Sequence, residues 1–379
     1  MSLASVPLQQ VTRLTPLPDV CACIEATAQP VAPRQLETAA AAGRVLAADV
    51  AVSERVPMTA IALRDGWAVR SDLVADANPY APAMLTPAPT WVDAGEPLPP
   101  DADAVLAFDA VTASGQAMEA VGSAALGEGV LGAGSEALPG QPLRRAGERL
   151  RQIDVAALRA AGVAQVQARE PSLSVYVANG SIGVADDVVA PLVARGVEAG
   201  GGVVRVQRAA DRNGRHLLEI LRADDADAVV VIGGTGSGRR DTSISALADA
   251  GRVIVHGVGI RPGETAAFGT VGSRPVLVLP GRLDAALAAW LLIGRRLLAC
   301  LTGSRETEPA MKVTLSRKVV STIGLAEVVP VGSSEGGVAP LASGCLPLQA
   351  LTQSVGWIFV PPESEGFPVG ATVELRPFP

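Results

Sequence analysis

The chain has 379 residues, of which 49% are hydrophobic, so it can bury a large core and is longer than a usual single domain. Its formal net charge of −7 argues against general nucleic-acid binding, which needs a basic surface to displace counterions from phosphates. No basic region followed by an apolar run marks the N-terminus, and the longest apolar stretch, Ala285 to Leu301, contains two arginines. We therefore expect a cytoplasmic protein with no membrane span.

The cysteines and histidines do not predict a transition-metal site. Four cysteines are scattered apart from one Cys-x-Cys pair, a spacing that suits neither a disulfide nor the usual zinc motif. His216 and His256 lie in different segments, with no second imidazole or cysteine at ligand spacing. The thiols are expected to be reduced.

Residues 1–45 are expected to be helical, with one helix from Pro16 to Ala28 and another from Gln35 to Gly43. Residues 146–168 are assigned to the same helical linker or dimerisation part, because a second amphipathic pattern covers Asp154 to Gly162. Between these segments, residues 46–145 carry short β-runs separated by proline and glycine, such as Trp67 to Val69 and Thr90 to Val92. This pattern predicts a separate β-rich module.

From residue 169 to residue 304 strands alternate with helices, which predicts a three-layer α/β domain with a mostly parallel sheet. Residues 305–379 return to short β-runs and predict a small C-terminal, β-barrel-like domain. The fold class expected is therefore multidomain α/β. The expected strands of the α/β domain are Leu173–Val177, Val203–Val206, Ala228–Ile232, Val253–Val255 and Val276–Leu279, and its expected helices are Asp187–Val197, Gly214–Arg222, Thr242–Ala248 and one from Asp284.

The most informative segment is a glycine-rich loop that follows the apolar strand Ala228–Ile232. Glycines permit backbone angles at which consecutive N–H groups converge on an anion, and the next helix offers its positive end. In a parallel sheet such loops lie at the carboxyl ends of the strands, where ligands bind. We expect a phosphorylated ligand here, against the alternative of an ordinary strand-to-helix turn. The residues assigned to binding are Gly233, Gly234, Thr235, Gly236, Ser237, Gly238 and Arg240.

Two further loops share this character. Arg261, Pro262 and Gly263 combine a rigid turn with a cation, and Pro280, Gly281 and Arg282 link a strand to a helix. Each loop alone is explained by a structural turn, but together with Arg239 and Arg240 the loops predict a pocket that binds an anion.

Asp65 and Asp241 are the acids assigned to catalysis and to a divalent cation, because hard cations take carboxylate ligands and neutralise phosphoanhydrides. The competing explanation for Asp241 is that it caps the helix that begins near Thr242.

The segments in their order identify a family resemblance. Gly43 to Val50, Asp65 to Val69, Gly95 to Val105 and Arg145 to Glu148 are followed by the three loops above and by Gly356-Trp-Ile and Glu365 to Gly370 in the tail. This order resembles the molybdopterin molybdenumtransferase family, which includes the C-terminal domain of gephyrin, over nearly the whole chain.

The resemblance implies a homodimer whose α/β domain binds molybdopterin, and whose reaction takes adenylylated molybdopterin and molybdate with Mg²⁺ and releases AMP. It implies that Asp65 and Asp241 lie near the active site, with Asp65 acting across the dimer interface. A molybdopterin adenylyltransferase or an apo-molybdoenzyme is the implied partner.

The chain also departs from that family at its charged positions. The acids expected after the first α/β strand are replaced within Ala178 to Ile182, and an acid that follows Gly-Glu is replaced by Arg149. The two-lysine motif becomes Arg261 to Thr265, with the second cation replaced by Glu264. Three functions are therefore open: a molybdenum-inserting enzyme, a carrier or chaperone that binds the cofactor without catalysis, and an interaction scaffold.

Overall fold

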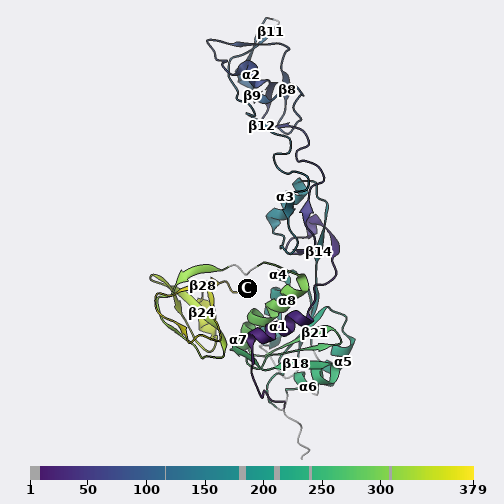
Figure 1. The fold of residues 1–379 in the computed structure, drawn as a ribbon, viewed down its shortest axis with the longest axis vertical. Coiled ribbons are helices and arrows are strands. Elements are labelled where there is room, and N and C mark those ends of the chain that lie inside the picture. The colour runs from purple at the N-terminus through teal and green to yellow at the C-terminus, as the bar shows by residue number, and fades with distance from the viewer. Residues whose placement is uncertain (1–8, 116, 179–184, 209–213, 239–240, 307–309) are drawn as a thin grey trace, which may run out of the picture. The chain divides into compact units, whose positions relative to one another are not determined.

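The computed structural model describes residues 9–115, 117–178, 185–208, 214–238, 241–306 and 310–379 (Figure 1). The chain divides into two compact units. The first unit comprises Met1–Ala48, Ala146–Gln152 and Gln165–Pro379, and the second comprises Asp49–Arg145 and Ile153–Ala164.

The first unit contains a six-stranded sheet whose order is β16, β15, β17, β21, β20, β18. β15 pairs in parallel with β16 and β17, and β17 pairs in parallel with β21, whereas β20 runs antiparallel to both of its neighbours. The prediction of a mostly parallel sheet is confirmed. The strands are β15 (Ser172–Val177), β16 (Val203–Arg208), β17 (Ala228–Ile232), β18 (Arg252–His256), β20 (Ala267–Val271) and β21 (Arg274–Leu279).

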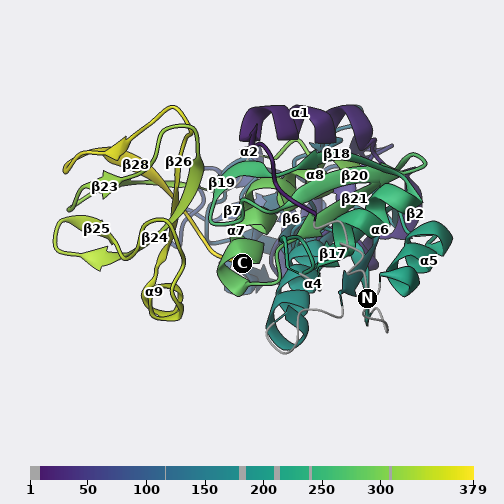
Figure 2. The ribbon, with the colours of Figure 1, turned by 90° about the horizontal axis from the view of Figure 1, so that it is seen from below.

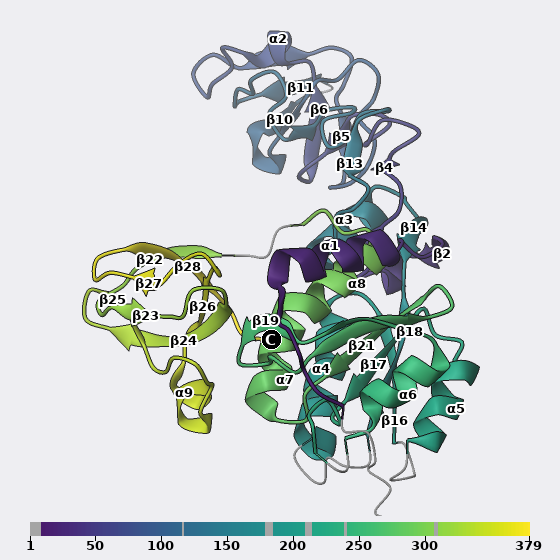
Figure 3. The same cartoon turned by 60° about the horizontal axis from the view of Figure 1, so that its bottom comes forward.

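Helices cover both faces of this sheet, as the alternation of buried side chains requires. Val175 and Val230 face a core made with α1, α4, α7 and α8, whereas Tyr176 and Val229 face a second core made with α5 and α6. Figures 2 and 3 show α5 and α6 together on one side of the sheet and α1 with α8 on the other. The helices are α1 (Leu17–Thr27), α4 (Ala190–Ala199), α5 (Arg215–Ala223), α6 (Ser243–Ala250), α7 (Leu283–Ala289) and α8 (Arg295–Thr302).

Helix α1 confirms the first helix predicted in the N-terminal segment. Leu17, Val20 and Ile24 are buried at spacings of three and four residues, so one face of α1 packs on the core and the other meets solvent. Two π-helical turns continue this side of the core: η3 (Ala185–Val189) precedes α4, and η4 (Trp290–Gly294) joins α7 to α8.

The second predicted helix, Gln35 to Gly43, is wrong. Its first half is strand β2 (Arg34–Glu37), followed by a short 3₁₀ turn, η1 (Thr38–Ala40). β2 pairs antiparallel with β14 (Gln165–Arg169), which also pairs with β3 (Val45–Leu46). Pairing with a strand about 130 residues away supplies backbone hydrogen bonds that the local pattern could not reveal, and it outweighs helix propensity.

A second sheet of the first unit extends from the α/β part into the C-terminal part. Its order is β1, β19, β24, β26, β28, β22, with β25 on β24. β19 lies in the segment predicted as a loop, and its parallel pairing with β24 aligns Arg261 with Glu327. The strands are β1 (Thr15–Pro16), β19 (Val258–Arg261), β22 (Met311–Thr314), β24 (Ala326–Ser334), β25 (Gly337–Pro340), β26 (Gly356–Val360) and β28 (Thr372–Arg376).

The C-terminal part also contains helix α9 (Leu348–Gln353) and a small ladder between β23 (Val319–Val320) and β27 (Gly366–Phe367). Trp357 of β26 is fully buried against Leu287 and Leu291 of the α7 and η4 segment. The C-terminal sheet therefore packs directly on the helical layer of the α/β part.

The second unit consists of short strands and turns, as its proline and glycine content predicts. Its sheets are β8-β6-β9 and β10-β11-β7, with the pairs β12-β5 and β13-β4. The strands are β4 (Val50–Ala51), β5 (Ile61–Ala62), β6 (Gly66–Val69), β7 (Ala83–Leu85), β8 (Thr90–Val92), β9 (Ala104–Leu106), β10 (Val111–Ser114), β11 (Ala117–Ala120), β12 (Val130–Leu131) and β13 (Pro142–Arg144). Its helical segments are α2 (Ser71–Val74), η2 (Phe108–Ala110) and α3 (Gln152–Ala160).

Among the described residues, one helical stretch, Leu283–Thr302, is long and apolar enough to cross a membrane by length and composition. However, 72% of its most apolar window is buried inside the structure, as in the core helix of a soluble protein.

Candidate functional site

The site is built at the edge where β15, β17 and β21 end together. Val177 of β15 lies opposite Ile232 of β17, which lies opposite Leu279 of β21. The first residue after β17, Gly233, still donates its N–H to the carbonyl of Leu279 at 2.8 Å. The loops that follow β17 and β21 therefore leave the sheet side by side, as the ligand loops of parallel sheets do.

The glycine loop after β17 turns sharply because its first two residues have positive φ, 91° at Gly233 and 68° at Gly234. A Cβ at Gly234 would lie 2.4 Å from Oγ of Ser243, so only glycine fits against the start of α6. The Ser243 hydroxyl donates to the Gly233 carbonyl at 2.8 Å, and the Ser243 N–H donates to the Gly234 carbonyl at 3.2 Å. The loop is thus fixed to the helix that it precedes.

A second loop, between β19 and β20, contacts the glycine loop directly. The hydroxyl oxygens of Thr235 and Thr265 are 2.8 Å apart, and Nε2 of His256 lies 3.0 Å from the Thr235 carbonyl oxygen. Thr235 is 4% exposed. Sequence reasoning assigned no role to Thr265 or His256, because their proximity to Thr235 arises from β18 and β20 and not from spacing along the chain.

Arg261 heads the second loop, which continues through the cis Arg261–Pro262 bond and Gly263 at φ 121°. The Glu264 side chain folds back onto this turn. One of its oxygens accepts from Nε of Arg261 at 3.3 Å, and the other accepts the Gly263 N–H at 3.0 Å. Arg261 also donates to the Thr322 hydroxyl of the C-terminal part at 3.3 Å. Its charge is therefore partly neutralised within the turn.

The third loop, Pro280 to Arg282, links β21 to α7. Arg282 makes a two-pronged ion pair with Asp284, with Nε to Oδ1 at 3.0 Å and Nη2 to Oδ2 at 2.5 Å. The hydrogen bond to Asp284 raises the pKa of Arg282 further above its usual value. Gly263 of the second loop lies close to the start of α7, since a Cβ at Gly263 would lie 3.0 Å from the carbonyl oxygen of Ala285. The structure thus brings all three predicted loops into one place.

Asp241 closes the glycine loop on itself. Its Oδ2 accepts the Gly238 N–H at 2.9 Å, its own N–H donates to the Gly238 carbonyl at 3.0 Å, and a Cβ at Gly236 would lie 2.8 Å from Oδ2. Helix α6 begins at Ser243, two residues further on, and its N-cap residue is Thr242. The explanation of Asp241 as the cap of α6 is wrong, because its carboxylate holds a loop amide instead.

The amides at the start of α6 donate hydrogen bonds to Gln9, a residue to which the sequence analysis assigned no role. Gln9, in the N-terminal segment, accepts with Oε1 from the N–H groups of Ile244 at 3.2 Å and Ser245 at 3.4 Å. Its Nε2 donates to the carbonyls of Gly234 at 2.6 Å and Gly236 at 2.9 Å. A separation of more than 220 residues left no signal in the sequence.

Two predicted binding residues, Ser237 and Gly238, lie in the exposed part of the glycine loop. Arg240 and the predicted change within residues 179–182 fall outside the described residues. Asp65 belongs to the second unit, where its Oδ1 accepts the Ala94 N–H at 2.7 Å in the turn before β6.

The described residues do not gather a set of ligands for Mg²⁺, since no group of three or more His, Cys, Asp or Glu side chains could hold a metal. Asp241 is engaged by a backbone amide, and hard cations need six or more oxygens in total. The assignment of Asp65 and Asp241 to one cation remains a prediction.

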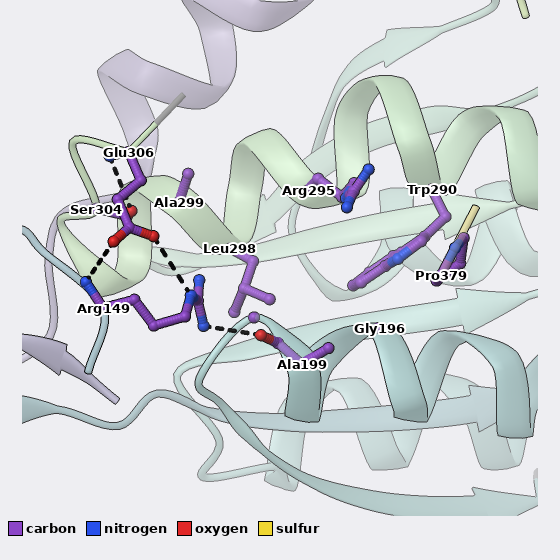
Figure 4. Close-up of a pocket in the computed structure, with 11 residues that line it drawn as sticks. Arg149, Gly196, Ala199, Trp290, Arg295, Leu298, Ala299, Ser304, Glu306 and Pro379 are labelled. Atoms are coloured by element: carbon purple, nitrogen blue, oxygen red, sulfur yellow. Dashed lines mark hydrogen bonds and ion pairs between the residues drawn. The ribbon is translucent and has the colours of Figure 1, made fainter. Parts of the chain in front are cut away.

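A cavity of about 230 Å³ lies elsewhere in the first unit, lined by Trp290, Leu298, Arg295, Arg149 and Glu306 (Figure 4). The cavity adjoins the C-terminal end of α4. Because α4 connects the parallel strands β15 and β16, this end of α4 lies at the edge of the sheet opposite to the three loops. Arg149 donates to the carbonyls of Ala199 at 2.8 Å and Gly43 at 3.0 Å, and its N–H donates to Glu306 at 2.8 Å.

These contacts explain the arginine at position 149 as a structural residue. Its guanidinium ties two carbonyls together at a helix C-terminus, where a cation is favoured and a carboxylate would be repelled. Burial lowers the pKa of Arg149, and the negative charge of Glu306 partly offsets this decrease. We therefore place the candidate site at the three loops rather than in this cavity.

Comparison with known proteins gives consistent matches along the chain. The family described as "MoeA N-terminal region (domain I and II)" matches residues 14–162, and the one described as "Probable molybdopterin binding domain" matches residues 173–299. The second match contains all three loops.

Among curated proteins, a molybdopterin biosynthesis protein of Methanocaldococcus jannaschii is 31% identical over 150 residues, 39% of this chain and 36% of the relative. Molybdopterin molybdenumtransferase 1 of Mycobacterium tuberculosis is 28% identical over 260 residues, 65% of this chain and 59% of the relative. The chain thus spans between about a third and three fifths of the length of these relatives.

Two crystal structures of the molybdopterin biosynthesis moeA protein from Pyrococcus horikoshii share the fold. They superpose with TM-scores of 0.75 and 0.74 at 21% and 23% identity, covering 96% and 97% of this chain and all of theirs.

Proposed function

This chain belongs to the MoeA family of molybdenum cofactor biosynthesis proteins, and we propose that its three loops bind molybdopterin or adenylylated molybdopterin and promote molybdate insertion with release of AMP. The observation that carries the proposal is the contact between Thr235 and Thr265, which joins two loops into one surface at the carboxyl edge of the sheet. Both loops lie inside the segment that matches the molybdopterin binding domain.

The chemistry of the loops suits a phosphate group. The glycine loop offers backbone N–H groups and carries no bulky side chain between Gly233 and Gly238, so an anion can approach its backbone closely. Arg261 and Arg282 belong to the two neighbouring loops. Fixed donors and cations of this kind stabilise negative charge as it develops on a phosphate during cleavage of a phosphoanhydride.

A second function, that of a carrier which binds the cofactor without inserting the metal, is favoured by a specific observation. Both flanking cations already have internal partners, Arg261 with Glu264 and Arg282 with Asp284. Each pair leaves less positive charge for a transition state than a free arginine would supply. Weak electrostatic stabilisation with an intact binding surface is the signature of a carrier.

Turnover and binding separate these functions. AMP release from adenylylated molybdopterin, followed with Mg²⁺ and molybdate present, is expected from the enzyme, whereas tight binding with no AMP release identifies the carrier. In the enzyme, Asp241→Asn should lower kcat at least tenfold, because the loop amide of Gly238 loses its charged acceptor.

The matched control for Asp241→Asn is Asp249→Asn, near the other end of α6. Equal rates of AMP release in Asp241→Asn and in the unaltered chain would remove Asp241 from the mechanism. A chain that neither binds the pterin nor releases AMP would leave the scaffold as its role.

A further inference from the structure

The side chain of Gln9 fills the position that an anion would take at the start of α6. Its Oε1 accepts from the N–H groups of Ile244 and Ser245, at 3.2 and 3.4 Å. The N–H of Ser243 goes to the Gly234 carbonyl, and that of Ala246 goes to the Thr242 carbonyl within the helix. With Gln9 in place, the amides of the first turn of α6 are all engaged.

The other half of the same carboxamide covers the loop carbonyls. Nε2 donates to the oxygens of Gly234 and Gly236, which point into the space between the glycine loop and α6. A single neutral group thus satisfies both acceptors and donors there. It resembles a bound ligand in its contacts, although it belongs to the chain itself.

An anionic oxygen would bind the same amides more strongly than Gln9 does. The contacts that Oε1 makes with α6 are long, at 3.2 and 3.4 Å from the N–H groups of Ile244 and Ser245 and 3.5 Å from the Ser245 hydroxyl, and their acceptor is uncharged. Hydrogen bonds to an ionised acceptor are about twice as strong as neutral ones, and the helix dipole favours negative charge at this end. At these amides a phosphate oxygen is therefore the stronger acceptor, whereas the Gly234 and Gly236 carbonyls lose the donor that Nε2 supplies when Gln9 leaves.

The segment that carries Gln9 can leave without disturbing the core. Gln10, Thr12 and Arg13 are exposed, and residues 9–14 form no helix or strand. The segment passes over Gly257, where a Cβ would lie 2.5 Å from the Val11 side chain and 2.6 Å from the Arg13 carbonyl oxygen. Regular pairing begins only at β1, where Thr15 donates its N–H to the Gly257 carbonyl at 2.9 Å. In Figure 3 this purple segment runs from α1 down to the edge that bears the loops.

We propose that the Gln9 side chain occupies the phosphate-binding position at the N-terminus of α6. The phosphate of an incoming ligand displaces this side chain. The proposal rests on the proposed function, because it assigns the same loops to the phosphate of the pterin ligand. Ligand binding and release of residues 9–14 are then coupled, and the coupling lowers the apparent affinity of the unaltered chain for its ligand.

The test compares the full chain with Gln9→Ala and with the control Gln10→Ala, whose side chain is exposed. Dissociation constants are measured for molybdopterin and for inorganic phosphate. Gln9→Ala should lower both by about 3- to 10-fold, since one or two hydrogen bonds of ordinary net strength change an equilibrium by about this factor. Gln10→Ala should leave them unchanged. A decrease for molybdopterin but not for phosphate would still support displacement, with the pterin needed to hold the anion.

Hydrogen exchange of residues 243–246 supplies a readout that does not depend on the ligand. Without ligand, Gln9→Ala should speed exchange of the Ile244 and Ser245 amides at least threefold, and Gln10→Ala should not. Unchanged exchange would overturn the proposal, because the contact would then be absent in solution.

If Gln9→Ala binds molybdopterin as tightly as the unaltered chain or more weakly, the ligand does not displace Gln9. The proposed function would stand, since Gln9 would then only position the loop. If no variant binds molybdopterin, the proposed function fails and the competition fails with it.

Discussion

Glu264 sets how much positive charge the loop after β19 presents to a ligand. It lies between Nε of Arg261 and the N–H of Gly263, and both members of the ion pair are a little over one third exposed. A pair so exposed contributes little to stability but does cancel charge close to the site. We therefore expect Glu264, which stands where the family motif has a cation, to lower the affinity of this loop for an anionic ligand.

Glu264→Gln should increase the affinity for molybdopterin by about 2- to 5-fold, because the amide can still accept from Gly263 while Arg261 gains an unpaired charge. Titration calorimetry at low and at physiological salt measures the change, and the gain should shrink as salt rises. Glu335→Gln makes the same charge change in the turn between β24 and β25. A gain of equal size in Glu335→Gln would show that net charge, and not the Arg261 loop, is responsible.

Tyr176 of β15 provides a second prediction for a single residue. Burial and the hydrogen bond that its hydroxyl donates to Asp224 at 2.5 Å raise the pKa of Tyr176 to about 12. In the unfolded chain the pKa of tyrosine is about 10. The neutral phenol is thus favoured in the folded state, so its contribution is complete below pH ~10 and is lost as pH rises toward about 12.

Tyr176→Phe should lower the free energy of unfolding by about 1.5–3 kcal/mol at pH 8, because it removes a hydrogen bond to a charged group. It should also remove part of the decline in stability between pH ~10 and about 12, as urea unfolding followed by circular dichroism can measure. Tyr80→Phe is the control, since Tyr80 is 99% exposed. An alkaline decline that is equally steep in Tyr176→Phe and the unaltered chain would contradict the assignment.

The glycine loop and α6 act as one element. The loop reverses direction at Gly233 and Gly234, Ser243 fixes it to the helix, and Asp241 holds its far end. The strand before it and the helix after it were predicted from the apolar run and the period of the pattern. The contacts that shape the loop, and the arrival of Gln9, depend on tertiary structure and could not be predicted from spacing.

Other elements show the same limit. Long, regular alternation between residues 172 and 302 predicted most strands and helices of the α/β part, because buried strands and amphipathic helices leave strong patterns. β2 and β19 were missed because each is only four residues long and gains its hydrogen bonds from distant partners. β20 was also not predicted, although it forms a hairpin with the next strand, β21. A short strand of this kind has no local signature.

Gly234→Ala should disrupt the loop, because an alanine there needs a positive φ and a Cβ 2.4 Å from Oγ of Ser243. We expect a loss of about 1–3 kcal/mol in stability and at least a tenfold weaker binding of molybdopterin. Gly272→Ala is the matched control, since φ is 61° there and nothing lies within 4 Å of the new Cβ. Equal affinity in the two variants would exclude the glycine loop from the site.

At the scale of the molecule, β19 joins the α/β part to the C-terminal sheet of the first unit. Its pairing with β24 and the contact of Arg261 with Thr322 place residues of the C-terminal part beside the second loop. Buried Glu327 accepts from the hydroxyls of Ser321 at 2.5 Å and Ser343 at 2.9 Å, which fixes the segments on either side of Arg261. The C-terminal part therefore supports the candidate site.

A crystal structure of the full chain with molybdopterin bound would locate the ligand relative to the three loops. We expect the pterin phosphate within hydrogen-bonding distance of the amides of the glycine loop and the first turn of α6, with Gln9 displaced from Ile244 and Ser245. Molybdopterin bound elsewhere, for example in the cavity beside Arg149 and Trp290, with Gln9 still in contact with α6, would contradict this expectation.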